Sequence, residues 1–245
     1  MTDQPTAPPS ERSLETRTRI LDAALSEFAL HGLAGARTER IASAAGVNKA
    51  LLYYYFESKE KLYLAALEMI AAKVRDRTMA VFLREGSAGE RVLRSALNHF
   101  DRIVGQQEFQ SLMQQEMIRL HKGESDVLPI LVKKVFEPTL IMFRSMVREG
   151  IASGELIDAD WLQIQLATLG ANVFYFLSAP IWRLVTGEDP LLVEALAARR
   201  KAVVEFLGQA LFQDRQHGAA LAAKVFADTP MPAIDGDRLK FGRNV

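Results

Sequence analysis

The fold is decided by residues 38–62, which read TERIASAAGVNKALLYYYFESKEKL. Apolar residues recur at helical spacing on both sides of Gly46, and glycine commonly ends a helix. We expect Thr38 to cap a short helix over 39–45, and Asn48 to cap a second short helix. The residues expected to meet in a small core are Ile41, Ala42, Ala45, Val47, Leu52 and Phe56. Two short helices joined by a tight turn over such a core are typical of a helix-turn-helix.

The second short helix carries polar groups suited to DNA. A helix of this length fits the major groove, which is about 12 Å wide. Lys49 can reach phosphate or guanine, Asn48 a base edge or phosphate, and the Tyr54 hydroxyl a phosphate oxygen. By helical spacing Phe56 faces back toward the core, and Tyr53 does so too unless it contacts DNA. The pattern indicates a recognition helix.

Longer helices flank this motif. Apolar residues recur at helical spacing over 13–31, and Gly32 follows where a helix ends. Ser58 can cap a helix that runs from Lys59 to about Leu83. The backbone donors at the start of that helix favour an anion such as phosphate.

The rest of the chain also reads as helix. Further helices are expected over 90–105, 108–122, 126–150, 160–185 and 190–213. No segment shows sustained strand alternation, so the predicted fold class is all-α. Pro138 and Pro180 are expected to kink or split their helices, and Asp189–Pro190 reads as a cap and a first helical position. Residues 1–12 read as a flexible leader, and 214–245 as a loose or partly ordered tail.

Composition excludes several classes of protein. The 245 residues include 30 basic, 30 acidic and no cysteine side chains, and 49% are hydrophobic. Without cysteine there is no disulfide, thiolate zinc site or cysteine nucleophile, and a reducing cytoplasm suits the chain. No uninterrupted apolar run approaches the roughly 18 residues that a membrane span needs, so neither secretion nor membrane insertion is expected. Zero net charge means that a nucleic-acid binder needs its basic groups placed locally.

Residues 16–62 resemble the N-terminal DNA-binding domain of the TetR family of transcriptional regulators. The matching features are RILDAA at 19–24, Phe28, Gly32, Thr38, AGV at 45–47, YYYF at 53–56 and SKEKL at 58–62. The resemblance implies a three-helix DNA-binding domain over 13–58 and a larger helical ligand-binding and dimerisation domain over 59–213. It places DNA contacts at Thr38, Asn48, Lys49, Leu51, Tyr53, Tyr54, Tyr55 and Lys59. Leu51 stands where the family commonly has threonine, so base preference does not transfer from a relative.

The resemblance further implies a homodimer that binds palindromic operator DNA and is released by a small molecule. Residues 108–185 are rich in methionine and aromatic side chains, which can line an adaptable pocket or simply pack a core. The predicted pocket residues are Met113, Met117, His121, Phe143, Met146, Asn172 and Phe174. Such a pocket predicts a hydrophobic or aromatic effector, and we expect no cofactor and no metal.

The family pattern places the dimer interface on residues 161–185 and 190–212. One apolar face would comprise Leu166, Leu169, Gly170, Val173 and Leu177, and the other Leu192, Leu196, Val203, Phe206, Leu207 and Leu211. Two such faces can form a four-helix seam between two copies.

Two other classes of protein fit the sequence less well. An all-α enzyme is disfavoured because the four histidines show no ligand spacing and no GxSxG or phosphate-loop pattern occurs, so no catalytic residue is predicted. A helical interaction protein without DNA binding predicts a damaged recognition helix, whereas Asn48, Lys49 and Tyr54 keep suitable donors. The prediction is therefore a cytoplasmic TetR-like regulator, usually a repressor in that family.

Overall fold

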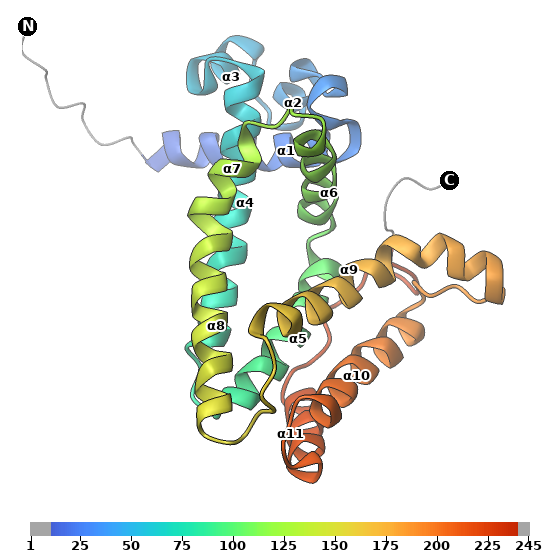
Figure 1. The fold of residues 1–245 in the computed structure, drawn as a ribbon. Coiled ribbons are helices and arrows are strands. Elements are labelled where there is room, and N and C mark those ends of the chain that lie inside the picture. The colour runs from blue at the N-terminus through green and yellow to red at the C-terminus, as the bar shows by residue number, and fades with distance from the viewer. Residues whose placement is uncertain (1–10, 240–245) are drawn as a thin grey trace, which may run out of the picture. The chain divides into compact units, whose positions relative to one another are not determined.

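The computed structural model describes residues 11–239, which fold almost entirely into helices (Figure 1). In chain order these are α1 (Glu11–Gly35), α2 (Thr38–Ala44), α3 (Lys49–Phe56), α4 (Lys59–Phe82), α5 (Ala88–Gly105), α6 (Gln107–His121), α7 (Val127–Leu131), the π-helix η1 (Val132–Phe136), α8 (Glu137–Ala152), α9 (Trp161–Thr186), α10 (Val193–Ala210) and α11 (Arg215–Ala227). The all-α class is confirmed. Of the predicted leader, only Glu11 and Arg12 are among the described residues, and they begin α1. Residues 240–245 of the predicted tail also lie outside the described range.

The chain divides into two compact units. Among the described residues, the first comprises 11–71 together with 108–128, and the second comprises 72–107 together with 129–239. Helix α6 therefore belongs to the unit that holds the helix-turn-helix, although it follows α5 of the second unit in the chain. The boundaries predicted for the functional domains stay predictions, because compactness alone does not test them.

A buried carboxylate holds α6 against α4 within the first unit. Glu116 is 0% exposed and accepts hydrogen bonds from the Tyr63 hydroxyl at 2.7 Å, from Arg119 Nη1 at 2.6 Å and from the Ser125 hydroxyl. Burial, and then the bond to Glu116, raises the pKa of Tyr63. Because an unpaired buried charge is costly, these three donors favour one packing of α6. Sequence periodicity contained no signal for this pairing.

Helix α1 breaks where glycine allows it to. Gly32 has a φ of 67° and interrupts the helical conformation, so the predicted end of the first helix is confirmed as a kink. Before the break, Ile20, Leu21 and Phe28 are buried. The Phe28 ring meets the Tyr63 ring edge-on at 4.9 Å, which places α1 against α4.

The predicted split near Pro138 is confirmed. The single helix expected over 126–150 is divided into α7, η1 and α8, and Pro138 occupies the first turn of α8. Proline cannot donate to the carbonyl four residues earlier, which belongs to Lys134. That carbonyl accepts from Arg75 Nη1 at 3.4 Å, so α4 supplies a donor at the break.

The predicted start of α10 is wrong. Asp189–Pro190 forms a turn, and α10 begins at Val193 after the N-cap residue Leu192. The Asp189 carboxylate accepts from Leu191 N at 3.0 Å and pairs with Arg238 at 2.5 Å. Burial by itself raises the pKa of Asp189, but these bonds outweigh it and lower that pKa. Because the Asp189 carboxylate bonds to Arg238, in the segment after α11, it does not cap α10.

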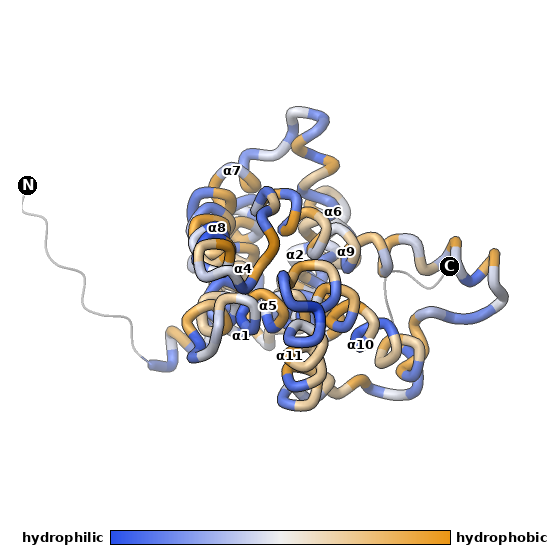
Figure 2. Tube along the Cα trace, turned by 60° about the horizontal axis from the view of Figure 1, so that its bottom comes forward, coloured by the Kyte–Doolittle hydropathy of each residue, from blue (hydrophilic) through white to orange (hydrophobic). Residues whose placement is uncertain are grey.

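The residues predicted as a loose tail contain helix α11, so that expectation is wrong for 215–227. Asp214 caps α11 by accepting from Gln216 N and His217 N. Buried Val225 and Ala222 join the core of the second unit. Figure 2 shows α10 and α11 next to each other, with hydrophobic residues along both. Pro230, Pro232 and Gly236, which disfavour a regular helix, lie beyond the end of α11.

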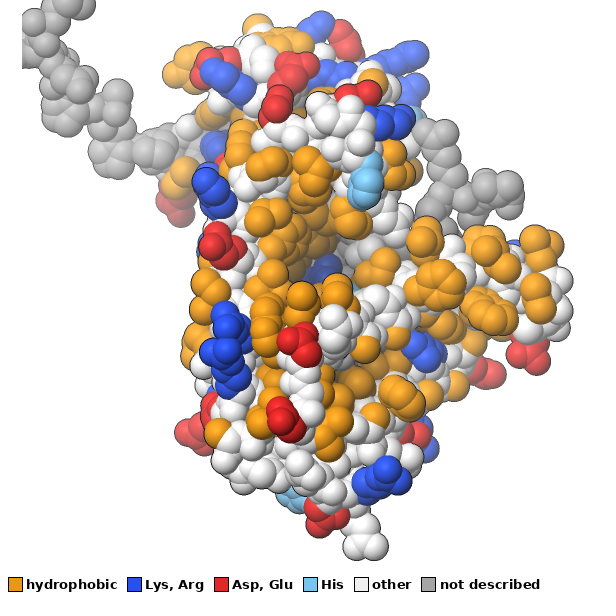
Figure 3. Space-filling model, viewed as in Figure 1, with side chains coloured by type: hydrophobic (Ala, Val, Ile, Leu, Met, Phe, Trp, Pro, Cys, Tyr) orange, Lys and Arg blue, Asp and Glu red, His pale blue; other side chains and the backbone are white. Residues whose placement is uncertain are grey.

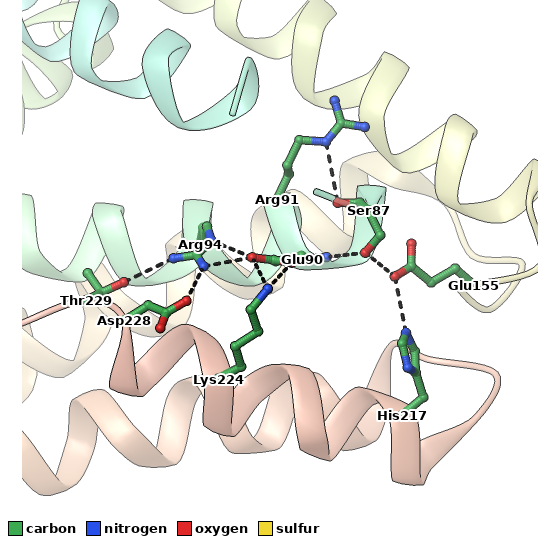
Figure 4. A network of polar contacts seen from close by, with 9 residues as sticks. All are labelled: Ser87, Glu90, Arg91, Arg94, Glu155, His217, Lys224, Asp228 and Thr229. Carbon is green, nitrogen blue, oxygen red and sulfur yellow. Dashed lines mark hydrogen bonds and ion pairs between the residues drawn. The ribbon is translucent and has the colours of Figure 1, made fainter. Parts of the chain in front are cut away.

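A polar network fastens α11 to α5 (Figure 4). The Glu90 carboxylate accepts from Arg94 Nη2 at 2.7 Å and from Lys224 Nζ at 3.0 Å, and Arg94 also donates to Asp228 at 2.9 Å. Burial raises the pKa of Glu90, but Arg94 and Lys224 outweigh burial and hold it below its ordinary value. Charges in the supposed tail therefore have partners on α5.

Helix α9 is long and mostly apolar, but one of its fully buried side chains is polar. An 18-residue window of mean hydropathy 1.3 makes it, among residues 11–239, the one helix that is long and apolar enough to cross a membrane. Nevertheless Asn172 of α9 is fully buried and donates to the Ala96 carbonyl of α5 at 3.2 Å. Pro180 lies inside α9 without ending it. The core helix of a soluble protein meets the same length and composition test, so the absence of a membrane partner stays a prediction.

Candidate functional site

The helix-turn-helix of α2 and α3 is built from local signals. Gly46 takes a φ of 66° at the turn, where a side chain is strained. The Asn48 side chain accepts from Leu51 N at 2.7 Å, so the predicted cap of α3 is confirmed. Ile41 and Leu52 are fully buried between the helices, as predicted. The turn and the shared buried core therefore fix the orientation of α3 relative to α2.

Thr38 does not cap α2, contrary to the prediction. The helix begins at Thr38 itself, and Arg37 takes the N-cap position without a side-chain bond. Thr38 is buried, and its hydroxyl lies 3.3 Å from the Tyr53 hydroxyl of α3. The Thr38 side chain is thus turned toward α3 and away from the backbone donors at its own helix start. The hydroxyls of Thr38 in α2 and Tyr53 in α3 thus face each other where the two helices meet. The DNA contacts predicted for these two residues stay predictions.

Lys49 is exposed at the first turn of α3 and pairs with an acidic side chain of α2. Its Nζ lies 2.5 Å from Glu39 Oε1. This bond raises the pKa of Lys49 and lowers the pKa of Glu39. The Lys49 ammonium also lies 5.8 Å from the centre of the Tyr53 ring. Because exposed ion pairs are weak, a DNA phosphate can replace Glu39. Glu39 was missed by sequence reasoning, since nothing local links residues ten positions apart.

The remaining predicted DNA contacts differ in exposure. Tyr54 is 79% exposed, and its ring stands edge-on to Tyr55 at 5.5 Å. Tyr55 and Leu51 are half-buried, and the Tyr55 hydroxyl lies 3.0 Å from the Ser13 hydroxyl of α1. Lys59 Nζ donates to the Ala34 carbonyl at 3.1 Å. Lys49 and Tyr54 are therefore the predicted contacts with long side chains that reach farthest into solvent.

The second unit contains a cavity of about 100 Å³. Residues of α4, α5, η1, α8 and α9 line it. The apolar wall comprises Val74, Phe82, Val135, Phe136, Phe143 and Leu169, and the polar lining comprises Arg75, Thr78, Ser95, Asn98, His99, Arg102, Thr139 and Gln165. Figure 3 shows a hollow on the face that bears α8 and α9, with hydrophobic side chains around it and a basic side chain inside.

The predicted pocket residues are not gathered in one place. Phe143 lines the cavity, while Met146 is buried in the core of the second unit and Asn172 bonds to α5. Phe174 is exposed on α9. The other three, Met113, Met117 and His121, lie on α6 in the first unit. Sequence reasoning missed the polar lining because His99 and Arg102 lie on α5, before the methionine-rich stretch.

Met113, Met117 and His121 have different surroundings within the first unit. Met113 is buried, while Met117 is exposed. His121 is the last residue of α6, and its Nδ1 lies 2.8 Å from the Met117 carbonyl. Helix α6 contacts α1 through Ser111, which donates to the Ala29 carbonyl at 3.2 Å. Ligand contacts at these three positions stay predictions.

The geometry of α1 to α3 defines a helix-turn-helix DNA-binding protein, with a buried inner face and polar groups on the outer face of the second helix. Residues 20–66 match the sequence model described as bacterial regulatory proteins, tetR family. The helix-turn-helix part of the chain therefore matches the DNA-binding domain of the TetR family. Similarity to individual proteins differs between this N-terminal part and the rest of the chain.

The sequence relatives match mainly the N-terminal part. The chain is 51% identical over 53 residues to the HTH-type transcriptional repressor SCO4008 of Streptomyces coelicolor, which is 22% of this chain and 28% of that protein. It is 34% identical over 115 residues to the HTH-type transcriptional repressor NicS of Pseudomonas putida, which is 46% of this chain and 53% of that protein. The chain thus matches about half or less of the length of these relatives.

The fold extends further than the sequence similarity. A protein of Saccharomonospora viridis, described as a transcriptional regulator and solved in complex with choline, matches with a TM-score of 0.66 and 20% identity. The match covers 82% of this chain and 100% of that one. At this level of identity the likeness concerns the fold, including the helices of the second unit.

Proposed function

We propose that this protein is a cytoplasmic transcriptional repressor that binds palindromic operator DNA as a homodimer. The observation that carries the proposal is the outward face of α3, where exposed Lys49 and Tyr54 stand on a buried helix-turn-helix core. Two of these helices about 34–36 Å apart enter successive major grooves on one face of the duplex. Two relatives that match part of the chain are both named transcriptional repressors, which supports repression as the proposed effect on transcription.

The homodimer is supported by the apolar surface of α9. Its exposed large apolar residues are Leu162, Leu166, Phe174, Leu177, Ile181, Trp182, Leu184 and Val185, and Phe206 of α10 is also 70% exposed. A contiguous apolar surface on a soluble protein is typical of an interface. The second predicted face needs correction, because Leu196, Val203, Leu207 and Leu211 of α10 and the loop after it are buried within the chain. The helical spacing of these four residues reflects the protein's own core. The exposed residues left for the proposed seam are therefore those of α9 together with Leu192 and Phe206.

Charged substitutions on the proposed seam are expected to separate the dimer. Changing Leu177 and Phe206 to glutamate places four carboxylates in a two-fold interface, because each substitution occurs twice. We expect dimerisation to weaken by roughly 100-fold or more. Sedimentation velocity measures the monomer fraction, and Leu83→Glu at an exposed position directly after α4 is the control. A double variant that sediments as the wild type does removes this surface from the proposal.

We further propose that a small-molecule effector occupies the cavity of the second unit and releases the DNA. Helix α4 supports this route, because it lines the cavity with Arg75, Thr78 and Phe82 and carries Tyr63 of the first unit on the same helix. The solved regulator with choline shows that a protein of this fold holds a small molecule. The effector would have to bind more tightly to the arrangement in which the two α3 helices are wrongly spaced for DNA. A difference of about 1–3 kcal/mol in its binding free energy changes DNA affinity about 5- to 150-fold.

The test of DNA recognition is selection of bound DNA from a random pool by the purified full-length protein. We expect an enriched palindrome whose half-site centres lie about 10 base pairs apart or a multiple of that. Binding of the selected DNA should fall steeply with added salt, because phosphate contacts release counterions. A pool that shows no enrichment after repeated selection contradicts the proposed function.

A further inference from the structure

We propose that the cavity of the second unit binds a small organic acid, whose carboxylate lies at Arg102 and whose apolar body lies against Phe82 and Phe143. This inference rests on the function proposed above, in which the cavity receives the effector, and it names the effector's chemical class. Sequence composition predicted only a hydrophobic or aromatic molecule. The polar lining adds the requirement for a negative charge.

The lining of the cavity is basic. Arg75, His99 and Arg102 are among the fourteen lining residues, and none of the fourteen is Asp or Glu. Arg75 donates to Asp76 Oδ1 at 2.9 and 3.0 Å. Asp101, which precedes Arg102, receives a bond from Arg200 Nε at 2.7 Å. An anion that enters therefore meets a guanidinium and no lining carboxylate.

Arg102 is charged and His99 is neutral at physiological pH. Burial lowers the pKa of Arg102 to about 10, which still leaves it protonated. Burial, and then repulsion by Arg102, lowers the pKa of His99 well below its ordinary value. Asn172 Nδ2 donates to the Ala96 carbonyl and lies 3.3 Å from His99 Nδ1. That His99 nitrogen is therefore an acceptor, which leaves Nε2 as the donor. A desolvated guanidinium gains most from an anion.

Two amides provide further donors. Asn98 and Gln165 line the cavity from α5 and α9, and within residues 11–239 neither side chain has a hydrogen-bond partner. The hydroxyls of Thr78 and Thr139, in contrast, donate to the carbonyls of Val74 and Val135, each four residues earlier in the chain. Each amide offers N–H donors as well as one carbonyl acceptor, and its N–H donors match the acceptor oxygens of a carboxylate.

The size of the cavity limits the body of the ligand. A cavity of about 100 Å³ is smaller than the engineered cavities of about 150 Å³ that bind benzene. The Phe82 and Phe143 rings lie 6.2 Å apart and give the wall an aromatic surface. A short chain with one carboxylate therefore fits the enclosed space, whereas a ring with a carboxylate has to extend toward the open side of the cavity.

Calorimetric titration of the full-length protein with matched acids and amides tests the inference. The pairs are benzoate and benzamide, phenylacetate and phenylacetamide, and hexanoate and hexanamide. We expect at least one acid to bind roughly 10- to 100-fold more tightly than its amide, the ratio typical of a charge-assisted hydrogen bond. Choline, a small cation, should not bind. The inference is overturned if no acid binds more tightly than its matched amide, or if none of the acids binds at millimolar concentration.

Variants locate the binding in the cavity. Arg102→Met should abolish the preference for the acid, and Arg102→Lys should keep it, since lysine retains the charge. Arg148→Met, at an exposed position of α8, is the matched control and should bind as the wild type does. An unchanged acid preference in folded Arg102→Met, checked by circular dichroism, contradicts the assignment.

The response of operator DNA separates this inference from the proposed function. If an acid binds at Arg102 but the affinity for the selected DNA does not change, the carboxylate site stands and its role as effector site fails. If a neutral compound releases the DNA from the wild type while all acids are inert, the regulator stands and the acid site fails.

Discussion

Replacing Lys49 and Tyr54 together with alanine is expected to abolish specific DNA binding while leaving the protein folded and dimeric. Both side chains are exposed on α3, and neither contributes to the buried core formed by Ile41 and Leu52. A homodimer loses both contacts in each half-site, so affinity for the selected palindrome should fall by roughly 100-fold or more. Electrophoretic mobility shift against salt concentration measures the loss.

Two controls make this prediction specific. Lys201→Ala removes an exposed lysine of α10 and should leave operator affinity unchanged. Glu39→Gln removes the carboxylate that pairs with Lys49 in the free protein, and it should bind DNA at least as tightly as the wild type, because phosphate no longer competes with Glu39. Wild-type affinity in the Lys49 and Tyr54 double variant would show that α3 is not the recognition helix.

Replacing Gly218 with alanine is expected to destabilise the second unit by about 3 kcal/mol, a large effect for one methyl group. Helices α10 and α11 cross where Gly208 faces Gly218. A Cβ on Gly218 would lie 2.0 Å from the Gly208 carbonyl oxygen and 2.7 Å from Phe212 Cγ. The Gly208 carbonyl is part of the backbone and cannot rotate away as a flexible side chain can. The substitution therefore forces α11 away from α10.

Urea unfolding followed by circular dichroism measures the change in free energy. Gly105→Ala at the end of α5 is the matched control, since a Cβ there meets nothing within 4 Å, and its stability should match the wild type. If Gly218→Ala unfolds at the same urea concentration as the wild type, the close crossing of α10 and α11 is wrong.

Local signals made the helix-turn-helix predictable. The cap at Asn48, the turn at Gly46 and the burial of Leu52 and Phe56 depend on residues only a few positions apart. Thr38 was misjudged because its hydroxyl has a partner fifteen residues away, Tyr53. Capping preference describes what a side chain does when no such partner competes.

The candidate pocket was predicted far less well, because composition does not say which helices meet. Methionines at 113 and 117 belong to α6, which bonds to α1 through Ser111 and Gln115. The cavity is instead lined by residues of α5 such as His99 and Arg102, outside the methionine-rich stretch. Likewise, the helical spacing of Leu196 and Val203 was correct, but it describes the protein's own core.

By itself, the sequence determined that the chain is all-α, where most helices begin and end, and that α3 carries polar side chains of types that suit DNA. Those properties follow from caps, glycines and periodicity within a few turns of chain. Only the tertiary structure decided that α6 packs with the helix-turn-helix, that α11 is part of the core, and that Arg102 lines a cavity without acidic residues. The physical reason is that periodicity shows which face of a helix is buried, whereas its partner is selected by contacts between residues far apart in the chain.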